Sequence, residues 1–497
     1  MLEAQGHRAP LKAVVFLVGV LVGGGPAVAT ELAQAALAVP HLDGRSLGLV
    51  WVVPFAGLLL SIALGPLFVP KLWDNHYGKI AAFWSLVLTG PFALIYGFPI
   101  AGYELLHVVL TDYLPFIILL TTLYTVTGGI RLTGDRLGTP GFNTVVIALG
   151  TILASIMGTT GASMMVIRPL LHANRHRRHV VHTVVFTIFL VANIGGALTP
   201  LGDPPLFLGF LHGVSFFWTA QHLWLPTLML SVVLLGLYFV LDCIFLGHEP
   251  PQSEDPGDSD PVVAEAEGGG EGGLRLEGGI NLALLLAIVG AVLLSGVWTP
   301  KVSFSLYRVP LEVQNLARDF LLLGITAASL LLTPPGTRAG NLFTWHPIME
   351  VAKLFAGIFI TIVPAVAMLR AGPEGALAAV VAIVTDSHGR PDNGLYFWVT
   401  GALSSFLDNA PTYLVFFNTA GGDAAGLMAH GPATLAAISA GAVYMGAMTY
   451  IGNAPNMMIK SIAERRGVVM PGFFAYMAWS GGLLIPLFLL TSVLFFR

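Results

Sequence analysis

Long apolar stretches alternate with short polar segments along most of the chain. A bilayer core about 30 Å thick requires about 20 apolar residues as helix. Ten stretches satisfy this, two of them with interruptions, at 47–69, 79–100, 114–130, 183–215, 223–245, 280–297, 315–333, 348–369, 432–464 and 471–495. The pattern predicts an all-α polytopic membrane protein with about ten spanning helices, of which 183–215 and 432–464 are discontinuous.

Two further apolar stretches, 142–173 and 396–419, do not fit a simple span. Each is split by a polar tip, "GTTGAS" in the first and "DNAPT" in the second, which leaves two short arms. Arms that are too short to cross a bilayer are typical of a helical hairpin that enters and leaves by one face. We therefore predict two re-entrant hairpins.

The interrupted segments occur twice. "GALTPLGDPP" at 196–205 resembles "GAMTYIGNAP" at 446–455, and "SIMGTTGASMM" at 155–165 aligns with "SFLDNAPTYLV" at 405–415 at the same spacing. Helix breaks at membrane depth survive only where they line a cavity or are covered by protein. Paired broken helices in inverted repeats, with a site between them, are the plan of a secondary transporter.

Lys and Arg predict the orientation of the repeats, because cytoplasmic loops are enriched in them. Segments 71–79, 131–136 and 175–178 carry these residues and become cytoplasmic if the spans alternate from an outside N-terminus. The loop 420–431 after the second hairpin contains neither residue, as an outside loop should. The two halves are thus predicted to be inverted, although the rule is broken by Lys301, Arg308 and Arg318.

The duplication predicts a first repeat at 30–247 and a second at 280–497. The segment 248–279 between them is rich in Pro, Gly, Asp and Glu and reads as an acidic, disordered cytoplasmic linker. The N-terminus has Arg8 and Lys12, an apolar core and then Ala27-Val28-Ala29. This layout favours a signal peptide at 1–29, with an uncleaved first helix as the alternative.

Composition narrows the class of protein. The chain is 55% hydrophobic and 10% charged with a mean hydropathy of +0.80, whereas soluble domains carry about 25% charged residues. The single cysteine, Cys243, excludes an internal disulfide framework and a cysteine-based metal cluster. The chain shows no Walker pattern, H-E-x-x-H or nucleophile elbow, so we expect neither an enzyme nor a nucleotide-driven pump.

The two hairpin tips, each followed by G-x-x-T-x-x-G-[DN]-x-P, resemble the ion transporter superfamily over residues 47–497. That superfamily contains dicarboxylate and citrate carriers, arsenite pumps and NhaD-type sodium:proton antiporters, and the chain looks most like the antiporters and the citrate transporter family. The resemblance implies alternating access, a bacterial inner membrane location and a homodimer. It implies no cofactor beyond transported Na⁺ and H⁺, and no nucleic-acid partner.

The resemblance also implies which residues bind the transported species. They occupy the hairpin tips and the unwound segments: Thr159, Thr160, Ser163, Asn193, Thr199, Gly202, Asp203, Asp408, Asn409, Thr412, Thr449, Gly452, Asn453 and Asn456. Among them the candidate Na⁺ ligands are Asp203, Asp408, Thr199 and Asn453. Dicarboxylate carriers typically place Ser-Asn-Thr at both tips, whereas this chain has Thr-Thr-Gly and Asp-Asn-Ala.

Charge favours a cation as the transported species. An intramembrane carboxylate is costly and marks a functional site by default, and both Asp203 and Asp408 fall on motif positions. Carboxylate, hydroxyl and amide oxygens suit a hard cation, and protons can compete for the same carboxylates. We therefore predict Na⁺/H⁺ antiport. The alternatives are Na⁺- or H⁺-coupled citrate or dicarboxylate symport and, for the two aspartates, simple capping of broken helices.

Four histidines, at 172, 176, 179 and 182, are spaced so that they could share one face of a cytoplasmic helix. Histidine changes charge near neutral pH, so the spacing predicts a pH sensor that includes His176 and His179. The alternative is that they belong to an ordinary positively charged cytoplasmic loop.

Overall fold

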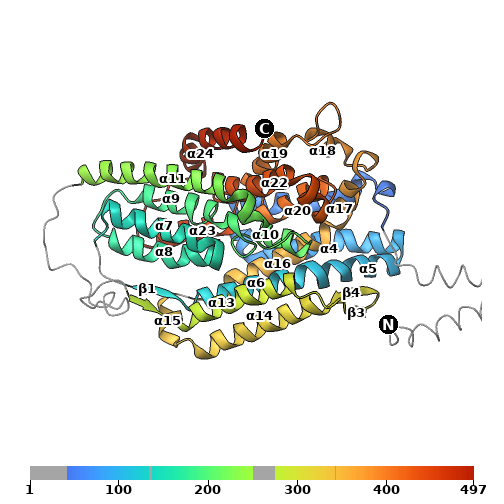
Figure 1. Ribbon diagram of the computed structural model, residues 1–497, viewed down its shortest axis with the longest axis horizontal. Coiled ribbons are helices and arrows are strands. Elements are labelled where there is room, and N and C mark those ends of the chain that lie inside the picture. Colours follow the sequence, from blue (N-terminus) through green and yellow to red (C-terminus); the bar gives the residue numbers. More distant parts are fainter. Residues whose placement is uncertain (1–41, 134–136, 250–274, 342) are drawn as a thin grey trace, which may run out of the picture.

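The protein is described by a computed structural model that covers residues 42–133, 137–249, 275–341 and 343–497 (Figure 1). The predicted signal peptide at 1–29 and most of the predicted linker lie outside this part of the chain. In the part described, nine helices are long and apolar enough to cross a membrane, or ten if the bent pair α16–α17 is one span. This confirms the prediction of an all-α polytopic protein.

The first half begins with α3 (Val53–Phe68) and α4 (Pro70–Tyr96), then a long helix interrupted once. That helix comprises α5 (Phe98–Val108), a π-helical turn η3 (Val109–Tyr113) and α6 (Leu114–Thr127). Pro115 at the start of α6 lacks a backbone N–H, which favours a local change of hydrogen-bonding pattern. The equivalent helices of the second half are α13 (Ile280–Val297), α14 (Val313–Leu332), the short α15 (Pro335–Gly340), α16 (His346–Thr361) and α17 (Val363–Arg370).

The segment 142–173 forms two adjacent helices, α7 (Pro140–Met157) and α8 (Thr159–Ala173), that turn at Gly158 with φ 81°. The segment 396–419 forms α19 (Asn393–Phe406) and α20 (Asn409–Thr419). The arm α7 has 18 residues and is long enough to cross a membrane, which differs from the expectation that both arms are short. The helical hairpins are therefore present, and their re-entrant nature stays a prediction.

Both discontinuous segments are broken at the predicted motifs. The first consists of α9 (Val181–Leu190), η4 (Ile194–Leu198) and α10 (Pro204–Leu211), and it is followed by α11 (Trp218–Gly247). The second consists of α22 (Pro432–Tyr444), η6 (Met445–Met448) and α23 (Ala454–Arg465), and it is followed by α24 (Phe473–Phe495). Between each 3-10 turn and the next helix the chain leaves the helical conformation, with extended backbones at Thr199 and Asp203 in the first segment and at Thr449 and Asn453 in the second. Gly and Pro interrupt the helical hydrogen bonds there.

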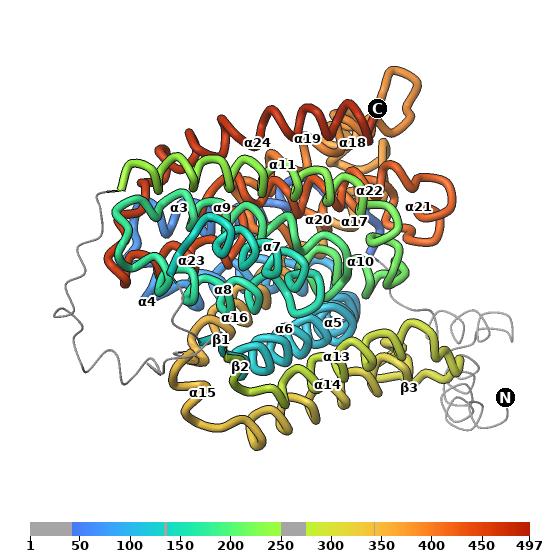
Figure 2. The backbone as a smooth tube through the Cα atoms, turned by 60° about the vertical axis from the view of Figure 1, so that its left-hand side comes forward, coloured from blue at the N-terminus to red at the C-terminus, as the bar shows by residue number. Residues whose placement is uncertain are grey.

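The helices divide into two groups. We call α3–α6 and α13–α17 the scaffold, and α7–α11 with α19–α23 the central bundle. Figure 2 shows α5, α6, α13 and α14 side by side along one flank, with α11 and α24 on the opposite flank. The first broken segment in this bundle is buried most completely among the described spans, since 89% of Val181–Leu198 lies inside the protein, against 17–44% for the others. This bundle therefore holds the polar helix breaks away from the lipid.

Two small antiparallel strand pairs lie at the helix ends. β1 (Arg131–Thr133) pairs with β2 (Arg275–Glu277), and Arg131 is 3.6 Å from Glu277. The predicted disordered linker, 248–279, is thus ordered at its C-terminal edge. β3 (Ser303–Leu306) pairs with β4 (Val309–Glu312) through a turn at Tyr307 and Arg308, both with positive φ, as two-residue hairpin turns require. The remaining short elements are η1 (Gly44–Ser46), η2 (Leu49–Val52), η5 (Gly372–Glu374), α18 (Ala378–Ile383) and α21 (Ala424–His430).

Two of the basic residues that do not fit the predicted orientation, Arg308 and Arg318, differ in their location and burial. Arg308 lies in the β3–β4 turn, but Arg318 lies on α14 with its side chain only 1% exposed. Arg318 is thus not a loop charge, and it does not bear on the orientation.

The inverted arrangement can be tested by cysteine labelling in a Cys243→Ser background. His176 follows the end of α8, and Arg465 is the last residue of α23. Both helices end toward the β1–β2 pair, whereas α21, which contains Ala425, lies toward the β3–β4 pair (Figure 2). We expect His176→Cys and Arg465→Cys to react with an impermeant maleimide from one side of the membrane and Ala425→Cys from the other. All three positions are exposed, so weak labelling would not arise from burial. Labelling of positions 176 and 425 from the same side would refute the inversion.

Candidate functional site

Asp203 lies at the centre of the broken segments, immediately before α10, and only 1% of it is exposed. Its Oδ1 accepts hydrogen bonds from Thr159 Oγ1 at 3.0 Å and Asn453 Nδ2 at 3.2 Å. Its Oδ2 accepts a bond from Asn409 Nδ2. Thr159 and Asn409 begin the second arms of the two hairpins, and Asn453 precedes α23. One carboxylate is therefore contacted by both hairpins and by the broken segment of the other repeat.

The donors to Asp203 are all neutral. In the described part of the chain, no Lys, Arg or His lies within ion-pair distance of this carboxylate. An ionised carboxylate removed from water costs several kcal/mol unless a positive charge or a proton compensates it. The site therefore fits a mobile cation or a proton as the compensating charge.

Two buried oxygens on the second arms of the hairpins have no hydrogen-bond partner among the described residues. They are Asn409 Oδ1 and Ser163 Oγ, on side chains that are fully buried. Asn409 already donates to Asp203 through its nitrogen, and Ser163 lies one turn after Thr159 on the same face of α8. Carboxylate, amide and hydroxyl oxygens of this kind are ligands for a hard cation.

Three asparagines extend the polar centre across both repeats. Asn193 donates to Asn456 Oδ1 at 2.8 Å, and Asn453 donates to Asn193 Oδ1 at 3.3 Å. Asn456 in turn donates to the backbone oxygens of Gly446 and Thr449, at 2.8 and 2.9 Å. The Asn456 amide thereby satisfies carbonyls that the break in the second segment leaves without intrahelical partners.

The two motif threonines join each broken segment to its own hairpin. Thr199 Oγ1 donates to the backbone oxygen of Ser155, and Thr449 Oγ1 donates to that of Ser405. These bonds join each broken segment to the first arm of its own hairpin. Ser155 and Ser405 were not predicted, although both open the aligned stretches at 155–165 and 405–415. The hydroxyl of Thr199, a predicted Na⁺ ligand, is directed to this backbone contact.

The motif glycines permit a close backbone approach. A Cβ atom on Gly202 would lie 2.1 Å from the Gly196 oxygen, and one on Gly452 would lie 2.6 Å from the Gly446 oxygen. The Gly202 oxygen also accepts a hydrogen bond from Thr159 N at 2.9 Å. These glycines therefore allow the backbone of each broken segment to pack closely on itself.

Asp408 is placed differently from Asp203. It is half-buried and caps α20, since its Oδ1 accepts from Ala410 N at 3.2 Å. Thr412 Oγ1 donates to the Asp408 backbone oxygen at 3.0 Å. Thr160, at the other tip, is half-buried and is not among the donors to Asp203. The capping alternative thus describes the geometry of Asp408, whereas Asp203 makes no side-chain cap.

The predicted histidine face does not form. His176 accepts from Arg175 Nε at 2.9 Å, and His179 Nδ1 lies 3.1 Å from Glu249 Oε1 at the end of α11. Partial desolvation acts to raise the pKa of Glu249, but hydrogen bonds from the His179 and Arg178 backbone N–H groups and the His179 ring outweigh it and lower the pKa. His179 therefore binds Glu249, which follows the C-terminal end of α11.

His182 turns inward instead. It lies in a buried cluster in which Asp242 Oδ1 is 2.8 Å from His182 Nε2 and 2.5 Å from Arg177 Nη2. Asn143 Nδ2 and the Tyr238 hydroxyl donate to the other carboxylate oxygen, at 3.0 and 3.3 Å. This cluster joins α7, α9 and α11 and was not predicted. Its charge is compensated within the protein, which contrasts with Asp203.

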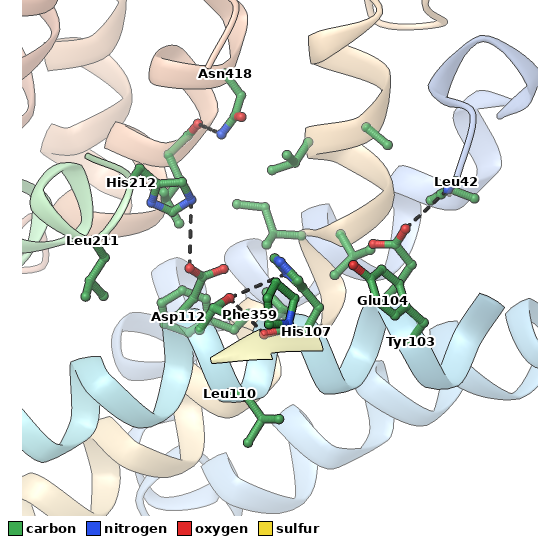
Figure 3. Close-up of a pocket in the computed structure, with 18 of the residues that line it drawn as sticks. Leu42, Tyr103, Glu104, His107, Leu110, Asp112, Leu211, His212, Phe359 and Asn418 are labelled. Atoms are coloured by element: carbon green, nitrogen blue, oxygen red, sulfur yellow. Dashed lines mark hydrogen bonds and ion pairs between the residues drawn. The ribbon is translucent and has the colours of Figure 1, made fainter. Parts of the chain in front are cut away.

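A cavity of about 790 Å³ opens between the scaffold and the central bundle, at the β3–β4 end of the molecule (Figure 3). Residues from α5, η3, α14 and α17 line one side, and residues from α10 and α20 line the other. Asp203 immediately precedes α10, and the other end of this helix, at Leu211 and His212, lies against the cavity. The cavity therefore lies at the end of α10 away from Asp203.

Comparison with known proteins places these features in context. The sequence profile of a family described as "Putative citrate transport" matches residues 44–496. An uncharacterized transporter of Mycobacterium bovis and one of Mycobacterium tuberculosis are each 26% identical over 332 residues, which is 65% of this chain and 69% of each relative. The match agrees with the superfamily resemblance and spans both repeats.

The close approach at Gly202 predicts a stability effect. Gly202→Ala should lower the free energy of unfolding by about 1–3 kcal/mol, because the added methyl group must displace the Gly196 carbonyl. Denaturant titration of the purified protein would measure this. Gly236→Ala in α11 is the matched control, since nothing lies within 4 Å of its Cβ position, and it should leave stability unchanged or slightly higher. Equal stability of the two variants would contradict the packing argument.

Proposed function

The chain belongs to the "Putative citrate transport" family of multi-pass membrane transporters, and we propose that it exchanges Na⁺ for H⁺ by alternating access. The two transported ions would compete for Asp203 at the junction of the two repeats. The same proposal places the protein in the bacterial inner membrane.

The observation that carries this proposal is the setting of Asp203. Its carboxylate is buried and receives only neutral donors. Two oxygens without partners among the described residues are Asn409 Oδ1, on one of these donors, and Ser163 Oγ, one turn after Thr159 on α8. Such a carboxylate requires a positive charge that the described side chains do not supply. A cation that can be replaced by a proton meets this requirement and provides coupling between the two.

The neighbouring residues have distinct parts in the exchange. With Na⁺ bound, Asp203 is ionised and the free oxygens complete the ligand set. With a proton bound, Asp203 is neutral and the donors Thr159, Asn409 and Asn453 still satisfy its oxygens. Because each state is compensated, either ion can accompany the site across the membrane, whereas the ionised, ion-free site is costly to move.

The family description favours a second candidate, Na⁺- or H⁺-coupled transport of citrate or another carboxylate. The hairpin tips offer neutral donors that suit carboxylate groups. A polyanion would, however, be repelled by the carboxylate of Asp203, and the carboxylate of Asp408 at the second hairpin tip would add to this repulsion. Carboxylate binding in this site would therefore require prior neutralisation of both aspartates.

A reconstituted system distinguishes the two candidates. Vesicles with purified protein are loaded with Na⁺ and placed in Na⁺-free medium, and the internal pH is followed with and without external citrate. We expect outward Na⁺ flow to acidify the interior to the same extent in both cases. Citrate-dependent flux with no proton movement in its absence would contradict exchange and favour symport.

Asp203→Asn should reduce the exchange at least about tenfold, because it removes the carboxylate charge that receives the three neutral donors while preserving the side-chain shape. Asp386→Asn is the control: this aspartate lies in an exposed loop and pairs with Arg390 at 3.1 Å, and its replacement should leave exchange unchanged. Wild-type exchange in Asp203→Asn would refute the assignment.

Asp408→Asn separates charge from capping, because Asn is as good an N-cap as Asp. If Asp408 is a shared ion ligand, the variant should fold normally and lose exchange. If Asp408 serves only as the cap of α20, the variant should retain exchange, and Asp203 alone would carry the ion.

A further inference from the structure

The end of α10 contacts the scaffold across the cavity. His212 follows the last residue of α10, and its Nε2 lies 3.8 Å from Asp112 Oδ1 in the π-helical turn η3 (Figure 3). Both side chains are mostly buried, with 19% and 16% exposed. The contact therefore joins the central bundle to the scaffold. It also lies at the opposite end of the short helix that starts at Asp203.

The hydrogen bond on the other ring nitrogen of His212 decides how this contact depends on protonation. His212 Nδ1 lies 2.9 Å from the Leu208 backbone oxygen. A carbonyl oxygen can only accept, so Nδ1 carries the hydrogen and a neutral ring presents an unprotonated Nε2 to Asp112. The lone pair of His212 Nε2 then faces the lone pairs of the Asp112 carboxylate, and the contact is repulsive. Only the protonated ring has an Nε2–H that the Asp112 carboxylate can accept.

His212 stands at the C-terminal end of α10. Other charged and titratable groups face the same cavity from every surrounding element. On α5 and η1 these are Glu104, His107 and Arg45 with Asp43; on β4, α14 and α17 they are Glu312, Arg318, Asp319 and Arg370.

Several of these groups already have partners. Arg318 Nε donates to Asp319 at 2.8 Å, and Arg370 Nε donates to Asn418 at 2.7 Å. Glu104 accepts from Leu42 N at 3.2 Å. Among the described residues, the ion-pair contact of His212 joins the end of α10 to η3 of the scaffold.

We propose that His212 and Asp112 form a proton-operated latch between α10 and η3, which closes when His212 is protonated. As the pH of the cavity rises and the ring loses its proton, the contact becomes repulsive and α10 is released from the scaffold. The latch rests on the proposed function only in requiring that α10 moves relative to the scaffold during transport. It would slow exchange when the medium on the β3–β4 side is acidic.

The test measures the distance between the two groups of helices without any transported ion. Nitroxide labels are placed at Ser215→Cys, after α10, and at Ser305→Cys, on β3, in a Cys243→Ser background; both serines are exposed. Electron paramagnetic resonance would report the distance distribution in nanodiscs. Between about pH 8.5 and about pH 5.5, the shorter population should increase about threefold, the scale of a partly exposed ion pair.

His212→Gln and Asp112→Asn should each make the distance distribution independent of pH. The same variants should exceed wild-type exchange about threefold at acidic pH on the β3–β4 side and equal it at alkaline pH. An unchanged wild-type distribution across this pH range, or a pH response that persists in His212→Gln, would overturn the latch. A pH-dependent distance in a protein that shows no Na⁺/H⁺ exchange would instead refute the proposed function alone.

Discussion

The burial of Asp203 without a cationic partner is the constraint on which the rest of the site depends. Its carboxylate is stabilised by hydrogen bonds from Thr159, Asn409 and Asn453, which belong to three separate segments. Neutral donors reduce the cost of desolvation but do not remove the charge. The negative charge of Asp203 is therefore compensated only when a cation or a proton is bound. The occupancy of this one carboxylate thus links the chemistry of the site to the position of the helices around it.

The duplicated backbone provides this setting. In each repeat a threonine hydroxyl joins the broken segment to its hairpin, at Ser155 in the first half and Ser405 in the second. The close packing at Gly202 and Gly452 has the same geometry in both halves. The side chains placed on this common frame differ, because Asp203 is matched by Asn453. The symmetric backbone thus holds an asymmetric site with a single fully buried carboxylate.

Periodicity and motif spacing predicted much of this architecture. The span 280–297 coincides with α13, and Asn193, Asn409, Asn453 and Asn456 all lie in the central polar cluster. Spacing could not predict which partner a short side chain selects once distant segments pack. The Thr199 hydroxyl therefore bonds a backbone oxygen, Asp408 caps a helix, and His182 turns inward to Asp242. These outcomes depend on crossings between helices that the order of residues alone does not specify.

The central claim is that Na⁺ and H⁺ share Asp203, and calorimetry tests it most directly. Na⁺ is titrated into the purified protein, near the pH at which exchange is fastest, in two buffers with different ionisation enthalpies. The difference between the two heats gives the number of protons released per Na⁺ bound. The account predicts proton release on Na⁺ binding in the wild type and neither binding nor release in Asp203→Asn. Na⁺ binding that releases no proton, or that persists unchanged in Asp203→Asn, would contradict it.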